Sequence, residues 1–135
     1  MTPDLLTLTA SVVALPGWRW MPGMLTTEGD RVWGVGTDLG TLFLDLANRT
    51  ALCFDEKHGW RRWLLDGSPR TPCEPPLPDF TDAATGGCML AMLDGQVGVA
   101  VGGDSTMVAV DLLSGEGATL AEACARVALA RGRWA

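Results

Sequence analysis

The most chemically reactive side chains of this sequence are one histidine and four cysteines. His58 follows Asp55 and Glu56, whose carboxylates could orient its imidazole, and a Cys–His pair would supply a nucleophile beside its base. Nothing in the spacing brings a thiol to His58, however, and the G-x-S-x-G elbow of serine hydrolases does not occur. We therefore expect no catalytic residues, and a small hydrolase centred on His58 is kept as an alternative.

The same side chains could in principle bind a metal. Cys53, His58 and Cys73 are candidate zinc ligands, but structural zinc sites usually take their ligands in pairs two to four residues apart, and the chain contains no C-x-x-C. A buried strand position for Cys53 and an exposed turn for His58 are the simpler interpretation. The sequence thus predicts neither a metal nor a cofactor. All four thiols, with Cys88 and Cys124 completing the set, are expected to be reduced in a cytosol.

Glycine-rich and acidic segments carry equally little chemistry. In Gly34–Gly40 the third glycine comes one position too late for the dinucleotide motif G-x-G-x-x-G, and no helical pattern follows. Lys57, the one lysine, is not placed as in a phosphate-binding loop. The nearest carboxylate pairs are Asp55 with Glu56 and Asp79 with Asp82, which we interpret as a solvated turn and a helix cap.

Six tryptophans and no tyrosine are the most unusual feature of the composition. Two short segments mix indole and guanidinium groups, and their side chains form the predicted binding surface: Trp18, Trp20, Trp60, Arg61, Arg62 and Trp63. Trp and Arg are enriched at the hot spots of protein interfaces. The same residues could instead form a core in which arginines shield the indole edges. Stacked indoles are also the basis of a second alternative, a small-ligand or nucleotide-binding domain.

The elements that must position these side chains begin with a helix from Pro3, capped by Thr2 and ended by Pro16-Gly17. Four short strands follow, separated by turn-forming residues too few to hold a crossover helix: 31–35, 41–46, 51–54 and 61–65. Such spacing predicts an antiparallel meander. Leu42, Leu44 and Leu46 share one face of it and should be half-buried. A proline-rich surface loop then covers about 66–80.

The second half of the chain predicts two helices around a hairpin. Asp82 should cap a helix over about 83–93, in which Gly86-Gly87 implies close packing against a neighbouring backbone. Alternating valines from Val97, a turn at 102–104 and a return over 106–112 predict a hairpin. Thr119 and Glu122 form a capping box for the last helix, which Trp134 is expected to dock. The fold class is therefore α+β: N-terminal helix, antiparallel meander, central helix, hairpin and C-terminal helix.

Length and charge narrow the class of protein further. The chain has 135 residues, which predicts one domain over 1–135. Its net charge of −6 argues against a nucleic-acid partner, because such binding depends on neutralising phosphates. Its apolar runs fall short of the roughly 18 residues that span a bilayer, so no membrane partner is expected.

Two segments resemble small uncharacterised proteins encoded in tailed-bacteriophage genomes. They are Leu15–Met24, LPGWRWMPGM, and Pro78–Ala91, PDFTDAATGGCMLA; the ending Gly117–Ala123 is similar to the last helix of those proteins. The chain departs from their pattern at Ala83, where a proline is usual, at Gly87, where a larger residue is usual, and in a longer middle region. The resemblance implies a phage or prophage source and action in the host cytoplasm. It brings no activity and no functional residues.

These observations favour a non-enzymatic binding protein. Its partner would be a host or phage protein, and an anti-defence role is one version of this hypothesis. A flat exposed apolar patch or a two-fold homodimer would support it, whereas a Trp-lined pocket would favour the small-ligand alternative.

Overall fold

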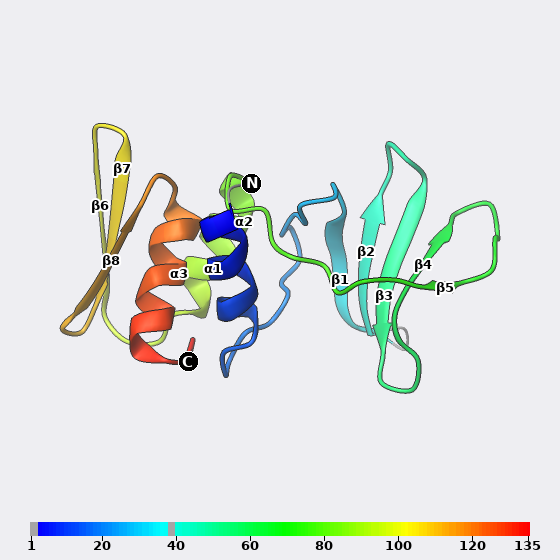
Figure 1. Ribbon diagram of the computed structural model, residues 1–135, viewed down its shortest axis with the longest axis horizontal. Helices are drawn as coiled ribbons and strands as arrows, with labels where there is room; N and C mark the ends of the chain where they lie inside the picture. The colour runs from blue at the N-terminus through cyan, green and yellow to red at the C-terminus, as the bar shows by residue number, and fades with distance from the viewer. Residues whose placement is uncertain (1–2, 38–39) are drawn as a thin grey trace. The chain divides into compact units, whose positions relative to one another are not determined.

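The computed structural model describes residues 3–37 and 40–135, with helices and antiparallel strands in two compact units (Figure 1). Unit 1 comprises Met1–Arg19 and Asp79–Ala135, and unit 2 comprises Trp20–Pro78. Thr2, predicted as a cap, lies outside the described residues, as do Asp38 and Leu39 of the glycine-rich turn. The single domain expected over 1–135 stays a prediction.

Unit 2 is the predicted antiparallel meander. Its strands are β1 (Arg31–Thr37), β2 (Gly40–Asp45), β3 (Thr50–Asp55), β4 (Gly59–Leu64) and β5 (Thr71–Pro72). They pair in chain order, each antiparallel to the next. The four expected strands are confirmed, and the two-residue β5 is an addition inside the proline-rich loop. β5 forms because Thr71 and Pro72 reach the free edge of β4 opposite Arg62 and Arg61.

One face of this sheet is the core of unit 2. Val32, Phe43 and Leu52 are direct neighbours across β1, β2 and β3, and all three are buried. The indole of Trp20 packs edge-on against Phe43, with ring centroids 5.0 Å apart. The face opposite this core carries Leu42, Leu44 and Leu46, which share one side of the sheet as predicted. They lie there because Phe43, between Leu42 and Leu44, points into the core and side chains alternate along a strand. Leu42 and Leu44 are half-buried as predicted, whereas Leu46 is 72% exposed.

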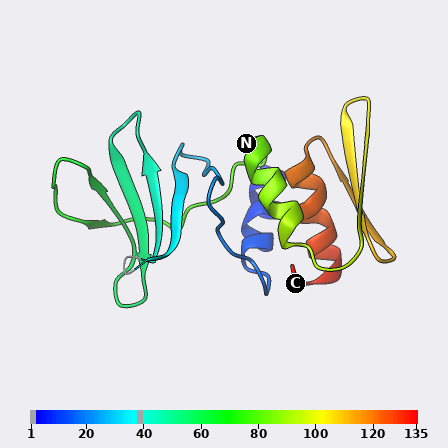
Figure 2. The ribbon, with the colours of Figure 1, turned by 180° about the vertical axis from the view of Figure 1, so that it is seen from behind.

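Unit 1 consists of three helices and a second antiparallel sheet (Figures 1 and 2). The helices are α1 (Pro3–Val13), α2 (Ala83–Met92) and α3 (Leu120–Arg131), and the strands are β6 (Val97–Gly102), β7 (Ser105–Val110) and β8 (Leu113–Gly117). The strands pair in the order β6-β7-β8, and α3 contacts α1, α2, β7 and β8. The predicted α+β class and element order are confirmed; β8 extends the predicted hairpin. No helix among the described residues has the length and apolarity to cross a bilayer.

Local sequence signals explain the ends of the helices in unit 1. The Asp82 carboxylate accepts a hydrogen bond from Thr85 N at 3.0 Å and so caps α2. Thr119 Oγ1 accepts from Glu122 N, while the Glu122 carboxylate accepts from Ala118 N, which is the predicted capping interaction shifted by one residue. Gly132, at φ +80°, ends α3 in the left-handed conformation.

Two glycines let backbone approach backbone in unit 1. A Cβ on Gly86 would lie 3.2 Å from Ala121 N, so the predicted close packing is confirmed at Gly86, while Gly87 has open space beside it. A Cβ on Gly115 would lie 2.6 Å from Ala123 O, so α3 rests directly on the backbone of β8. This contact explains why an LSGEG segment with little strand propensity still forms a strand.

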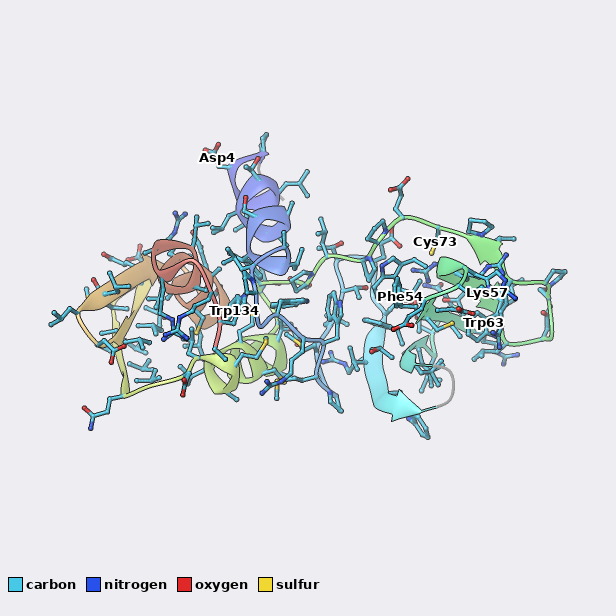
Figure 3. All side chains as sticks on the ribbon, turned by 90° about the horizontal axis from the view of Figure 1, so that it is seen from below. Asp4, Phe54, Lys57, Trp63, Cys73 and Trp134 are labelled. Carbon is cyan, nitrogen blue, oxygen red and sulfur yellow. The ribbon has the colours of Figure 1, made fainter. Side chains whose placement is uncertain are left out.

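The C-terminal tryptophan completes the core of unit 1. Trp134 is fully buried, donates from Nε1 to Val12 O at 2.8 Å and lies 5.5 Å from the Trp18 ring. Figure 3 shows its side chain within the group of helices. The expectation that Trp134 docks the end of α3 is thus confirmed.

Candidate binding surface

Strand alternation divides the Trp60-Arg61-Arg62-Trp63 segment between the two faces of the sheet. Trp60 lies on the core face, where its ring centroid is 5.6 Å from Phe43 and 5.2 Å from Phe54. Arg62 is opposite Leu52 and so shares that face. Arg61 and Trp63 point to the other side, which we call the open face. The four predicted residues of this segment therefore form two pairs with different surroundings.

The other two predicted residues make contacts typical of a core. Trp18 is half-buried against Trp134 in unit 1, and Trp20 is half-buried against Phe43 in unit 2. Trp60 is half-buried between two phenylalanines. The contacts of these three indoles match the core interpretation of the tryptophans, and the binding interpretation of the six residues stays a prediction.

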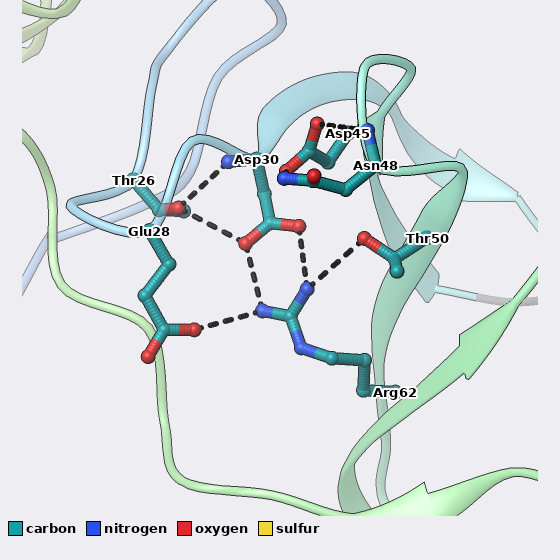
Figure 4. A network of polar contacts seen from close by, with 7 residues as sticks. All are labelled: Thr26, Glu28, Asp30, Asp45, Asn48, Thr50 and Arg62. Atoms are coloured by element: carbon teal, nitrogen blue, oxygen red, sulfur yellow. Dashed lines mark hydrogen bonds and ion pairs between the residues drawn. The ribbon is translucent and has the colours of Figure 1, made fainter.

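Arg62 holds the loop before β1 against the sheet (Figure 4). Its guanidinium makes a bidentate contact with the fully buried Asp30 carboxylate, at 2.8 and 2.7 Å, and a third contact with Glu28 at 3.0 Å. Thr26 Oγ1 donates to Asp30 and accepts from its backbone N–H. The hydrogen bonds that Arg62 donates to the Asp30 carboxylate raise the pKa of Arg62. Every charge in this network has a partner within it. We therefore assign the network a structural role, which is to fix the 26–30 turn.

On the open face the two small residues are buried, and the longer ones on β2 and β4 are half-buried. Ala51 and Cys53 in β3 are buried between longer neighbours on β2 and β4. Trp63 is half-buried beneath the Arg70 guanidinium, which lies 4.6 Å from its ring centroid. Arg61 Nε is buried and has no hydrogen-bond partner among the described residues.

Trp33 is the most accessible indole that the structure describes on this sheet. It is 70% exposed and sits at a register shift, where Val32 pairs with Phe43 but Gly34 pairs with the next residue, Leu42. Such an extra residue bends a strand and redirects a side chain. Trp33 was not predicted as part of the surface, because no second tryptophan lies near it in the sequence. The only available signal was the glycine that follows it.

Leu46 projects from a turn whose backbone is held on both sides. Asp45 accepts from Asn48 N at 3.1 Å and from Asn48 Nδ2 at 2.8 Å, and these bonds lower the pKa of Asp45 (Figure 4). Leu65 N donates to Arg49 O at 2.8 Å, which ties the turn to the end of β4. Arg49 adopts a left-handed φ of +54° there. An exposed leucine is thus presented on a fixed backbone rather than on a free loop.

Two shallow hollows flank Leu46. One, of about 290 Å³, is lined by residues of the 29–33 segment and by the two leucines of β2 and its turn: Gly29, Arg31, Val32, Trp33, Leu44 and Leu46. The other, of about 620 Å³, is lined by both ends of the neighbouring hairpin: Leu46, Asn48, Arg49, Leu64, Leu65 and Asp66. We call the exposed or half-buried apolar residues of both hollows the Trp33–Leu46 surface: Trp33, Leu44, Leu46, Leu64 and Leu65.

The Trp33–Leu46 surface has the make-up of a protein contact site. Its apolar centre is bordered by arginine, asparagine and aspartate. Exposed apolar patches with a polar border mark interaction sites on soluble domains. Arg31 is anchored, since its guanidinium donates to Gly23 O at 2.7 Å. The Asp66 carboxylate accepts from Ser68, which lowers its pKa and keeps it charged.

The residues considered for catalysis and metal binding lie elsewhere. His58 Nδ1 is 2.9 Å from Asp55 Oδ2 on the exposed β3–β4 turn, and in the part of the chain described no thiol or hydroxyl is hydrogen-bonded to this ring. Cys53 is buried in β3, and Cys73 is half-buried beyond β5. Burial raises the pKa of every cysteine thiol, that of Cys124 to about 12. Figure 3 labels Cys73 in unit 2. These thiols are protonated at neutral pH, the less nucleophilic form.

No protein family, curated protein or solved structure matches this chain. Neither hollow beside Leu46 is lined by Trp18, Trp20 or Trp63, the residues whose pocket would have favoured a small ligand.

Proposed function

We propose that this chain is a non-enzymatic protein-binding module that contacts its partner through the Trp33–Leu46 surface. The partner would be a host or phage protein in the bacterial cytoplasm, in keeping with the resemblance of segments 15–24 and 78–91 to phage-encoded proteins. An anti-defence role is one version of this proposal and rests on that resemblance alone.

The observation that carries the proposal is the cost of leaving Trp33 and Leu46 in water. Both are more than two-thirds exposed, although burying such a side chain is worth about 1.5–3 kcal/mol. The fold also holds both in place, Trp33 by the bulge of β1 and Leu46 by the Asp45–Asn48 turn. A contact surface prepared in this way loses little conformational entropy on binding.

Site-specific photocrosslinking tests the proposal directly. A benzophenone amino acid at position 33, expressed in the native host, should give one discrete crosslinked species with a host or phage protein. The same probe with Leu46→Asp in the same chain should lose most of that species, because the charge would be buried in the contact.

Leu112 provides the matched control position. It is fully exposed at the β7–β8 turn in unit 1 and lies on neither hollow. The probe at position 112 should not give the species seen from position 33. Equal crosslinking from both positions, or none from position 33, would contradict the proposal.

A further inference from the structure

The edge of the unit 1 sheet carries a second surface, independent of the first. β6 pairs with β7 along one side only, and among the described strands none pairs with its other side. In an antiparallel pair, every second residue directs its N–H and C=O away from its partner strand. The outer edge of β6 therefore presents a row of hydrogen-bonding groups to another strand.

This edge lacks the features that usually protect an edge strand. From Gly95 to Gly103 there is no charged residue and no proline, in a chain whose net charge is −6. Natural edges are normally blocked by lysine, proline, a bulge or a covering element. β6 pairs with β7 without a register shift from Val97 to Gly102, so it has no bulge either.

The valines of β6 are left uncovered on the side of the sheet that α3 occupies. Val99 is opposite Val108 and Val101 is opposite Thr106, and both of those β7 residues are buried. α3 contacts β7 and β8 but not β6, because Gly115 draws the helix onto β8. Val99 and Val101 consequently remain 46% and 76% exposed. The core of unit 1 thus ends one strand before the sheet does.

We infer that β6 pairs antiparallel with β6 of a second copy of this chain across a two-fold axis. The exposed valines then extend one core into the other, and the two three-stranded sheets become one six-stranded sheet. A second copy fits because it is uncharged along the same stretch, whereas a strand bearing either charge would lose hydration beside the valines.

Side-chain identity selects the register of this pairing. With Ala100 opposite Ala100 of the second copy, each Val99 faces a Val101, so the two exposed valines of β6 cover each other. A shift that places Val99 opposite Val99 would instead set the 76% exposed Val101 opposite Val97, which is already half-buried. The Ala100-centred register covers the more exposed pair and is the one we infer.

An edge contact of this kind is small, so the dimer should be reversible, with a dissociation constant on the order of 10 μM. Sedimentation velocity over a concentration series should show mass rising towards twice 14.3 kDa. Val101→Lys should raise the dissociation constant at least tenfold and leave the circular dichroism spectrum unchanged, because Val101 is mostly exposed.

Disulfide trapping tests the register. Under mild oxidation Ala100→Cys should form an intermolecular disulfide, since directly opposed residues have Cα atoms about 4.5–5.5 Å apart. Gly98→Cys is the matched control: it lies on the same face of the same strand, with open space for a side chain, but would face Gly102 of the other copy. A monomer at every concentration, or equal trapping at positions 98 and 100, would overturn the inference.

Discussion

Arg62 is the single residue on which the turn beside the Trp33–Leu46 surface depends most. Replacing it with methionine leaves the buried Asp30 carboxylate without its bidentate partner, an imbalance worth about 3 kcal/mol. We expect Arg62→Met to lower the free energy of unfolding by about that amount in urea titrations. Glu28→Gln should lower it by less than about 1 kcal/mol, because Glu28 is exposed.

A double variant shows whether the loss comes from the unpaired Asp30 charge or from the missing Arg62 side chain itself. Asp30→Asn in the Arg62→Met background should recover part of the loss, since no unpaired buried charge remains. If Arg62→Met were no more destabilising than Glu28→Gln, the network would not be fixing the turn.

Asp45 should contribute measurably to the way the free energy of unfolding falls at acidic pH. Its pKa is lowered by hydrogen bonds from Asn48, so the unfolded chain binds this proton more readily than the native one. The stabilisation is complete above the unfolded pKa of about 4 and is lost as the pH falls through the lower native pKa. Urea unfolding of wild type and Asp45→Asn should therefore differ at pH 6 and converge at the acid end.

Asn48→Ala provides the complementary test, because it removes the donor and keeps the carboxylate. It should reproduce the convergence at low pH. A difference between wild type and either variant that stays constant with pH would show that Asp45 titrates alike in both states.

At the scale of elements, the contact of α3 with β8 determines which part of the second sheet is covered. Gly115→Ala would place a methyl group 2.6 Å from Ala123 O, and we expect a loss of about 2 kcal/mol in unfolding free energy. Gly98→Ala on β6 meets open space and should change stability by less than about 0.5 kcal/mol. Similar losses at the two positions would mean that α3 does not rest on the strand backbone.

The elements with strong local signals were predictable from sequence. Caps such as Asp82 and Thr119, and the turn-separated strands of unit 2, depend on neighbours within a few residues. β5 and β8 were not predictable, because each is a strand only through its partner: Thr71-Pro72 through the edge of β4, and Gly115 through contact with α3.

The candidate surface was harder to predict for the same reason. Composition pointed to the Trp60–Trp63 segment, and alternation within β4 places one half of it on the open face, where both residues are half-buried. Which of the two faces is the open one, however, depends on the packing of Phe43 against Trp20 and Trp60. These contacts join residues that are distant in sequence. The register shift that redirects Trp33 likewise belongs to the β1–β2 pair and to neither strand alone.

At the scale of the whole molecule, net charge should govern how the two copies associate. Each chain carries −6, so a dimer concentrates negative charge while its contact strand is neutral. Salt screens this repulsion. We expect the dissociation constant measured by sedimentation to fall several-fold between low and high ionic strength. A dimer that weakens with salt would indicate ion pairs across the contact instead.

Dimerisation would also give each assembly two Trp33–Leu46 surfaces. A partner with two sites could then bind with a higher apparent affinity than a single contact provides. Under the proposed function, Val101→Lys should weaken binding to a multivalent partner while leaving its affinity for one isolated site unchanged.

The comparison of Trp33→Ala with Trp60→Ala tests whether Trp33 serves binding while Trp60 serves the fold. For each variant, urea unfolding would be measured beside binding of the protein captured from position 33. We predict that Trp33→Ala unfolds within about 0.5 kcal/mol of wild type yet loses the partner. Trp60→Ala should lose about 3 kcal/mol of stability, while its folded fraction still binds. Retained binding by Trp33→Ala, or lost binding by folded Trp60→Ala, would contradict this assignment.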